Sequence, residues 1–313
     1  MKSQTDNIAK EDAYTLALFA QDEIKLLRNL QALIGVRYIY HENFKNHATP
    51  NVALMYKPGK FNFRASYAAG FRTPTLSELY ATDIAKKNDR LTIGNLDLKP
   101  EKNNYFSLSA EYVHERFSVS VNAFYNNIRD MIDYNTIATG DKAMEQYGHK
   151  EVRQRDNIAE AKVHGINVSA NAYLGAGFNL SGGYTHLNTQ DVELGQPIDK
   201  SIKNAYNINA QWAHSWKIYR LNINLNGRIN SKRFSKSYGY APEYQLWNLN
   251  TRHSFNLKSV IIEPGCGMEN LFDYMDDRPY NSNYATLTPG RSFYISLSLK
   301  FKTLKKLLRL IEV

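Results

Sequence analysis

Long stretches of the chain alternate between apolar and polar residues. Between Tyr219 and Asn230, apolar residues and one glycine occupy the odd positions, and two arginines and four asparagines occupy the even positions. Successive side chains of a β-strand point to opposite faces, so this pattern predicts a strand with one apolar face and one wet face. A dry protein core would leave the arginines and asparagines unpaired. A water-filled lumen on one side and lipid on the other would suit both faces.

About thirteen segments share this period of two, and most are as long as a tilted membrane strand, about 9–11 residues. A soluble sheet with one solvated face is the alternative interpretation, but the polar positions carry few Lys and Glu for a protein surface. The segments are Tyr14 to Glu23, Gln31 to His41, Asn51 to Tyr56, Phe61 to Phe71, Asn104 to Val113, Phe117 to Ile128, Ile158 to Leu174, Phe178 to Asn188, Ala205 to His214, Tyr219 to Asn230, Tyr244 to Phe255, Val260 to Leu271 and Phe293 to Phe301.

The connections between these segments alternate in length. Those after every odd-numbered segment are short, as in Lys57 to Lys60, whereas most of the others are long, as in Arg72 to Asn103 and Arg129 to Asn157. Short turns on one side and long loops on the other are typical of an outer-membrane β-barrel. Complete bacterial barrels have an even number of strands, so we expect an N-terminal portion of the barrel to lie outside this sequence.

The amino-acid composition excludes some classes of protein. The chain has 39 Lys and Arg against 30 Asp and Glu, for a net charge of +9, but the cations are scattered, which argues against nucleic-acid binding and suits an anionic lipid surface. No apolar run is long enough for a membrane helix. Cys266 is the only cysteine, so no intrachain disulfide can form. Met1 to Asp12 contains no apolar export segment, so either the chain is cytosolic or its true start is missing.

Several motifs resemble those of TonB-dependent outer-membrane receptors. The stretch Phe71, Arg72, Thr73 and Pro74 is similar to the family's "FRAP" box, and Gly94 to Glu101, with Asn95 and Leu96, is similar to its "NPNL-x-PE" box. Near the end, Asn270, Leu271 and Phe272, followed by Pro289, Gly290 and Arg291, resemble the last outer loop and terminal strand. Other matches are Leu18 to Glu23, Gly35 to Tyr38 and Asn157 to Ile166.

The resemblance implies an all-β fold, an antiparallel transmembrane β-barrel whose roughly thirteen strands here correspond to the last thirteen of a 22-stranded plugged barrel. Residues 1–301 would form this barrel portion, and residues 302–313 a basic amphipathic tail. Such receptors lie in the outer membrane of Gram-negative bacteria, among lipid and lipopolysaccharide. They import a scarce nutrient chelate, such as a ferric siderophore, cobalamin or heme, with energy relayed by TonB through the plug. The plug would lie in the missing portion.

Candidate ligand-binding residues lie in the predicted outer loops. Arg72 could bind an anionic chelate, but its first expected role is to hold the long loop against the wall. No histidine lies between Pro74 and Asn95, where heme receptors of the family carry an axial ligand, and this lowers the expectation of heme. We predict no catalytic residue, no resident metal and no cofactor. The remaining candidates are aromatic side chains and one histidine: Tyr80, Tyr134, Tyr147, His149, Tyr240, Tyr280 and Tyr284.

Three other functions remain open at this point. A hydrolase at the barrel rim would need a compact group of Ser, His and acidic residues, which the sequence does not reveal. A passive channel would need no plug and would give steady conductance. A truncated, non-functional receptor fragment would lack a plug in the upstream reading frame.

Overall fold

A computed structural model describes residues 12–86, 88–157, 160–236, 238–276 and 285–302. Two predicted ligand residues, Tyr280 and Tyr284, and nearly all of the predicted tail lie outside these ranges. The chain forms two compact units. The first comprises Met1–Ser109, Ala123–His164 and Asn188–Ile198, and the second comprises Ala110–Asn122, Gly165–Leu187 and Asp199–Val313.

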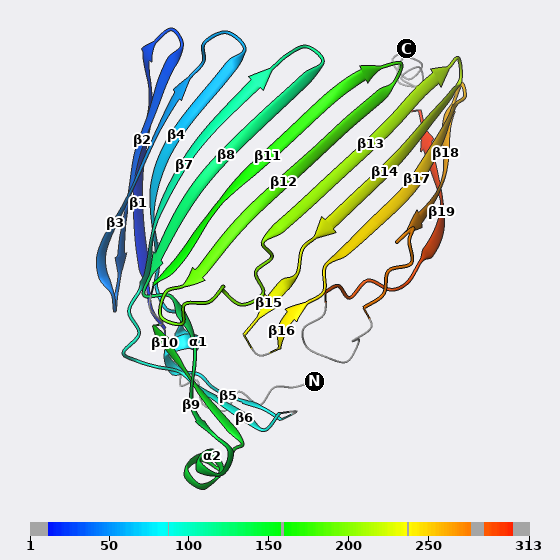
Figure 1. The fold of residues 1–313 in the computed structure, drawn as a ribbon. Coiled ribbons are helices and arrows are strands. Elements are labelled where there is room, and N and C mark those ends of the chain that lie inside the picture. Colours follow the sequence, from blue (N-terminus) through cyan, green and yellow to red (C-terminus); the bar gives the residue numbers. More distant parts are fainter. Residues whose placement is uncertain (1–11, 87, 158–159, 237, 277–284, 303–313) are drawn as a thin grey trace, which may run out of the picture. The chain divides into compact units, whose positions relative to one another are not determined.

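Thirteen strands within the described residues form one sheet, in chain order, and every one of the thirteen predicted segments is confirmed as a strand (Figure 1). The strands are β1 (Thr15–Leu27), β2 (Leu30–His41), β3 (Lys45–Tyr56), β4 (Phe61–Arg72), β7 (Glu101–Val113), β8 (Phe117–Arg129), β11 (Ala161–Gly175), β12 (Phe178–Asp191), β13 (Asn204–Trp216), β14 (Tyr219–Asn230), β17 (Tyr244–Asn256), β18 (Val260–Glu269) and β19 (Ser292–Phe301).

The strands lie where the sequence predicts them, and the two largest differences of boundary are at the end of β1 and the start of β3. The turn between β1 and β2 is tighter than predicted, because β1 continues to Leu27 and β2 begins at Leu30. Strand β3 begins at Lys45, whereas the sequence predicts a start at Asn51. Lys45 pairs with His41, the last residue of β2, so a short hairpin joins the two strands. Lys45 has a φ of 60° and allows this tight reversal. The sequence does not predict this extension, because apolar and polar residues do not alternate between Lys45 and Pro50.

The second unit shows the two faces that the alternation predicts. Leu225 of β14 lies opposite Ala210 of β13 and Leu249 of β17, so apolar side chains meet on one face. The asparagines meet on the other face, where Asn209 Nδ2 donates to Asn224 Oδ1 at 3.1 Å and to Asn226 Oδ1. A hollow of about 580 Å³ opens on the asparagine side and is lined by Asn207, Asn209, Asn226, Arg228 and Asn248, among others. Each face therefore suits a different solvent.

The final strand exposes its apolar face. In β19, Phe293 is 70% exposed, Ile295 is 88% exposed and Leu297 is 66% exposed. Register with β18 is continuous from Glu269 opposite Ser292 to Val260 opposite Phe301. Soluble monomers rarely present such a large apolar surface to water, so this face requires lipid or another apolar partner.

Aromatic rings gather on the apolar face near the short turns of the second unit. Trp216 stacks on Tyr219, with 5.5 Å between ring centroids, and Tyr219 lies against Phe255 at 5.0 Å. Phe178 and Trp212 continue the series at 6.0 Å. We call these five residues the aromatic belt. Such a band is typical of the level where membrane hydrocarbon meets the polar headgroups.

The described residues include no helix that is both long and apolar enough to cross a membrane.

The two longest connections of the first unit carry structure that periodicity did not predict. They contain α1 (Leu76–Tyr80), β5 (Thr82–Ala85) and β6 (Arg90–Ile93), then β9 (Ile132–Thr139), α2 (Gly140–Tyr147) and β10 (Glu151–Asn157). The strands form a separate sheet, in the order β5, β6, β10, β9, which we call the loop sheet (Figure 1). Strand β6 runs parallel to β10, with Leu91 opposite Val152, so the two connections are joined by main-chain hydrogen bonds. In the second unit, β15 (Arg233–Ser235) pairs with β16 (Gly239–Ala241).

Candidate functional site

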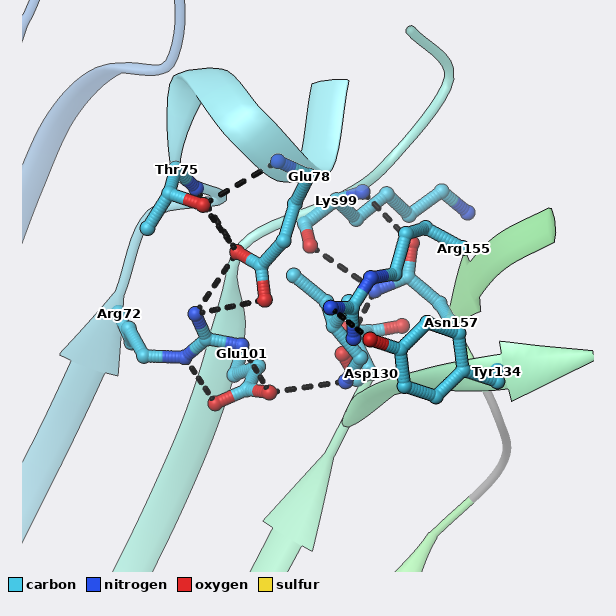
Figure 2. Close-up of polar contacts among 10 residues, drawn as sticks. Arg72, Thr75, Glu78, Lys99, Glu101, Asp130, Tyr134, Arg155 and Asn157 are labelled. Carbon is cyan, nitrogen blue, oxygen red and sulfur yellow. Dashed lines mark hydrogen bonds and ion pairs between the residues drawn. The ribbon is translucent and has the colours of Figure 1, made fainter. Parts of the chain in front are cut away.

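Arg72, at the end of β4, forms the centre of a polar cluster at the base of the loop sheet (Figure 2). Its Nε and Nη2 atoms donate to the two carboxylate oxygens of Glu101, both at 2.6 Å. Its Nη1 atom donates to Glu78 Oε2 at 2.9 Å. The planar guanidinium matches the two-pronged carboxylate, so this contact fixes direction as well as distance. One arginine therefore joins β4, α1 and β7.

Helix α1 begins with a capping box that orients Glu78. The Glu78 amide donates to Thr75 Oγ1 at 3.2 Å, and the Thr75 amide donates back to Glu78 Oε2 at 2.8 Å. Burial by itself would raise the pKa of the Glu78 carboxyl. The hydrogen bonds from Arg72 and Thr75 outweigh burial and lower that pKa below its usual value. Glu78 is therefore held as the carboxylate that Arg72 requires.

Asn157, at the end of β10, fastens the second connection to the first (Figure 2). Its Oδ1 atom accepts from the Lys99 amide at 2.6 Å, and its Nδ2 atom donates to the Lys99 carbonyl at 2.9 Å and to the Asp130 carbonyl at 2.6 Å. Glu101 also accepts from the Ile132 amide at 2.8 Å. We call Arg72, Glu78, Glu101 and Asn157 the loop anchor.

A small apolar cluster forms beside the anchor. Leu79, Leu98 and Ile132 are buried, and Phe44 and Tyr80 pack against them. Gly94 is required for close approach, because a Cβ there would lie 2.6 Å from the Leu79 carbonyl oxygen. The two family boxes thus describe one physical unit: "FRTP" supplies Arg72, and "GNLDLKPE" supplies Gly94, Leu98 and Glu101.

One face of the loop sheet is rich in arginine. Arg90 lies opposite Glu151 in the register, and Glu151, Arg153 and Arg155 are alternate residues of β10, so these side chains share a face. Arg155 lies over the ring of Tyr134, 3.7 Å from its centroid. Glu151 pairs with Arg153 Nε. The Nε atom of Arg90 is buried, with no hydrogen-bond partner among the described residues. We call Arg90, Arg153, Arg155 and Tyr134 the arginine face.

His149, in the turn after α2, binds the other connection. Its Nδ1 atom lies 2.9 Å from Asp89 Oδ1. The hydrogen bond from His149 is the main reason that the pKa of Asp89 falls below its usual value. A depressed pKa means that this contact stabilises the fold above the pKa of Asp89 in the unfolded chain, about 3.9. The stabilisation is lost as pH falls through the lower, folded-state pKa.

Replacing His149 by alanine is expected to return the pKa of Asp89 to its ordinary range. The carboxyl would lose its main hydrogen bond, so Asp89 would bind a proton at higher pH than in the wild type. An NMR titration of the Asp89 carboxyl carbon measures this. An unchanged midpoint in His149→Ala would contradict the assignment of the contact, and Lys142→Ala on α2 serves as the control.

The closing motif residues form a second cluster, in the second unit. Asn270 is 1% exposed and has a φ of 52°. Its Nδ2 atom donates to the carbonyls of Tyr274 at 2.7 Å and Pro289 at 3.1 Å. The Arg291 amide donates to Asp273 Oδ1 at 2.6 Å, and Arg291 Nε donates to the Leu271 carbonyl at 3.1 Å. These motif residues join the two ends of the last connection and leave Phe272 exposed.

The structure brings some predicted ligand residues together and separates others. Arg72 and Tyr134 lie within the set of Figure 2. Tyr80 packs in the apolar cluster, and Tyr147 ends α2 beside His149. Tyr240 lies in the second unit, 57% exposed, with its ring against Phe234. Ligand contact by any of these residues stays a prediction.

Sequence reasoning missed the arginine face. Arg153 and Arg155 do alternate in a short polar run, but that run lies inside the connection from Arg129 to Asn157, which was predicted as a loop. The described residues contain no group of three His, Cys, Asp or Glu side chains that could hold a metal ion. The guanidinium groups of Arg90, Arg153 and Arg155 make the arginine face suited to holding an anion.

Comparison with known proteins gives one family. The family described as "TonB dependent receptor-like, beta-barrel" matches residues 2–271. The ferric enterobactin receptor of Pseudomonas aeruginosa is 23% identical over 330 residues, which cover 94% of this chain and 43% of that receptor. The chain therefore spans less than half the length of this curated relative.

Solved structures show the same fold. A mutant of the ferric enterobactin receptor PfeA from Pseudomonas aeruginosa matches with a TM-score of 0.74 at 21% identity, over 93% of this chain and 45% of that one. The siderophore receptor PirA from Acinetobacter baumannii matches with a TM-score of 0.71 at 17% identity, over 95% of this chain and 48% of that one. The copper transporter OprC matches with a TM-score of 0.71 at 13% identity, over 93% of this chain and 48% of that one.

Proposed function

Because this chain belongs to the family of TonB-dependent receptor-like β-barrels, we propose that it forms the C-terminal barrel wall of a receptor that imports a ferric siderophore. Members of this family are outer-membrane proteins of Gram-negative bacteria, and this chain is placed there with them. The expected fold class, an all-β antiparallel barrel wall, is confirmed. The family consists of receptors and transporters rather than enzymes.

The observation that carries the proposal is the arginine face on a sheet built from two long outer loops. Ferric siderophores whose donors are catecholates or carboxylates carry negative charge, and guanidinium groups bind such oxygens through several directed hydrogen bonds. Three guanidinium groups and two carboxylates, those of Glu151 and Asp83, share this face within the described residues, so its net charge still favours an anion. The loop anchor holds the face in place. Two named relatives that share the fold are siderophore receptors.

Transport requires partners beyond these residues. We propose that a plug domain in the full-length receptor contacts TonB and gates the lumen, and that the loop sheet provides the first contact with the ligand. Outer-membrane lipid would cover the apolar face, and lipopolysaccharide would surround the outer ends of the strands. The short turns would then face the periplasm.

Deletion of the gene that encodes this chain tests the proposal in the host. We expect growth to stop on one class of ferric siderophore as the sole iron source, to return with the wild-type gene, and to depend on TonB. Undiminished growth on every siderophore tested would refute the siderophore assignment. Growth lost instead on cobalamin, heme or limiting copper would identify a different cargo.

A copper ligand is the second candidate, because the copper transporter OprC shares this fold. The arginine face argues against a bare cation and favours an anionic chelate, because its three guanidinium groups outnumber its two carboxylates. A double variant, Arg153→Ala with Arg155→Ala, separates the two candidates. We expect binding of an anionic ferric siderophore to weaken about 10–100-fold, as for the loss of one or two charged hydrogen bonds. Unchanged siderophore affinity, measured by calorimetry with Lys142→Ala as the control, would remove the arginine face from the proposal.

A further inference from the structure

Three lysines of the second unit lie at the ends of its strands where the short turns are. Lys217 lies between β13 and β14, Lys258 lies between β17 and β18, and Lys302 follows β19. All three are exposed, and no ion pair among the described residues joins any of them to an acid. Lys300, by contrast, pairs with Glu263 at 2.6 Å.

Hydrogen bonds between the turns hold these lysines in neighbouring positions. The Asn256 amide donates to the Ile218 carbonyl at 2.7 Å, which joins the turn of Lys217 to the turn of Lys258. Lys302 Nζ donates to the Leu257 carbonyl at 2.8 Å, and the Lys302 amide donates to the Ser259 carbonyl at 3.0 Å. The three cations therefore form one surface, which we call the lysine rim.

The aromatic belt lies next to the lysine rim. Trp216 immediately precedes Lys217, and Tyr219 and Phe255 belong to the strand ends that these turns join. Ile218 is 58% exposed, so an apolar side chain also reaches the tip of the turn. Farther along the same strands, Leu221, Ile223 and Leu225 continue the apolar face.

We propose that the lysine rim binds the headgroups of anionic phospholipids in the leaflet that the short turns face. The order along the strands is apolar side chains, then aromatic rings, then cations, which matches acyl chains, the interface and phosphate in a bilayer. The rim selects anionic headgroups over zwitterionic ones through charge. A lysine near such a surface contributes about a fivefold preference.

Tryptophan quenching tests this proposal, because Trp212 and Trp216 lie in the belt and the chain has 3 tryptophans in all. The full-length receptor is reconstituted in phosphatidylcholine vesicles that contain brominated phosphatidylglycerol or, separately, brominated phosphatidylcholine. We expect brominated phosphatidylglycerol to quench more strongly, with a preference of at least tenfold in relative binding that falls as salt increases.

Three triple variants decide the origin of the preference, and the two Lys→Gln triples lose equal charge. Lys217→Gln, Lys258→Gln and Lys302→Gln together should abolish it, whereas the corresponding Lys→Arg triple should keep it. Lys200→Gln, Lys203→Gln and Lys236→Gln, at exposed loop positions of the same unit, should leave it unchanged. Equal quenching by both lipids in the wild type, a preference that survives in the rim triple, or its loss in the loop triple would overturn the proposal.

Discussion

Replacement of Leu225 by arginine is expected to destabilise the folded protein in lipid vesicles by about 2–4 kcal/mol. Leu225 lies halfway along β14, with Ala210 and Leu249 opposite it on the apolar face. A guanidinium at this depth loses its hydration and finds no anionic partner in hydrocarbon. Urea unfolding of the receptor in phosphatidylcholine vesicles, followed by tryptophan fluorescence, measures the loss.

Gln211→Arg is the matched control for Leu225→Arg. Gln211 lies opposite Asn224, so it has the same depth as Leu225 but the opposite face. An arginine there would enter the asparagine-lined side and stay hydrated, at a cost of less than about 1 kcal/mol. Equal destabilisation by the two substitutions would contradict the assignment of the faces.

Glu101→Ala is expected to release the loop sheet from the end of β4 while the barrel wall stays folded. The substitution removes three hydrogen bonds at once, two from Arg72 and one from the Ile132 amide. Loss of a charged partner costs about 3–5 kcal/mol when both groups are buried. Arg72 is 42% exposed and partly screened by water, so we expect about 2–3 kcal/mol locally.

Hydrogen exchange followed by mass spectrometry reads this effect segment by segment. Amides of β9 and β10 should exchange about 30–100-fold faster in Glu101→Ala, and those of β13 and β14 should not change. Lys102→Ala, the next residue and outside the anchor, is the control. If β9 and β10 keep their protection, Glu101 does not anchor the loops. Siderophore affinity should fall together with protection if the arginine face binds the ligand.

The strands of the wall were predictable from sequence because each one faces two different solvents. Alternation at Tyr219 to Asn230 reflects lipid on one side and water on the other, and neither depends on the identity of the neighbouring strand. Elements in the long loops obey no such rule. Strand β6 forms because residues 90–93 meet residues 151–154, about sixty positions away, and no local period encodes that pairing.

The resemblance to the family motifs identified the residues that hold the long loops, but it did not predict their contacts. Arg72 and Glu101 were both recognised, but their bidentate pairing required the structure. One loop signal could have been read directly. Thr75 followed by Glu78 is the capping-box pattern, which predicts the start of α1. The alternation of Arg153 and Arg155 could also be read from the sequence. The positive charge of their face depends in addition on Arg90, which comes from the other loop and is placed there only by the fold.

Thiol labelling along β14 tests the central claim, that this sheet is a barrel wall between lipid and water, most directly. Single cysteines replace residues 221–226 in turn in a Cys266→Ser background, and the receptor in outer membranes is treated with a membrane-impermeant maleimide. We predict labelling with a period of two, fast at Asn222, Asn224 and Asn226 and at least tenfold slower at Leu221, Ile223 and Leu225. Equal labelling at adjacent positions would contradict the barrel-wall account.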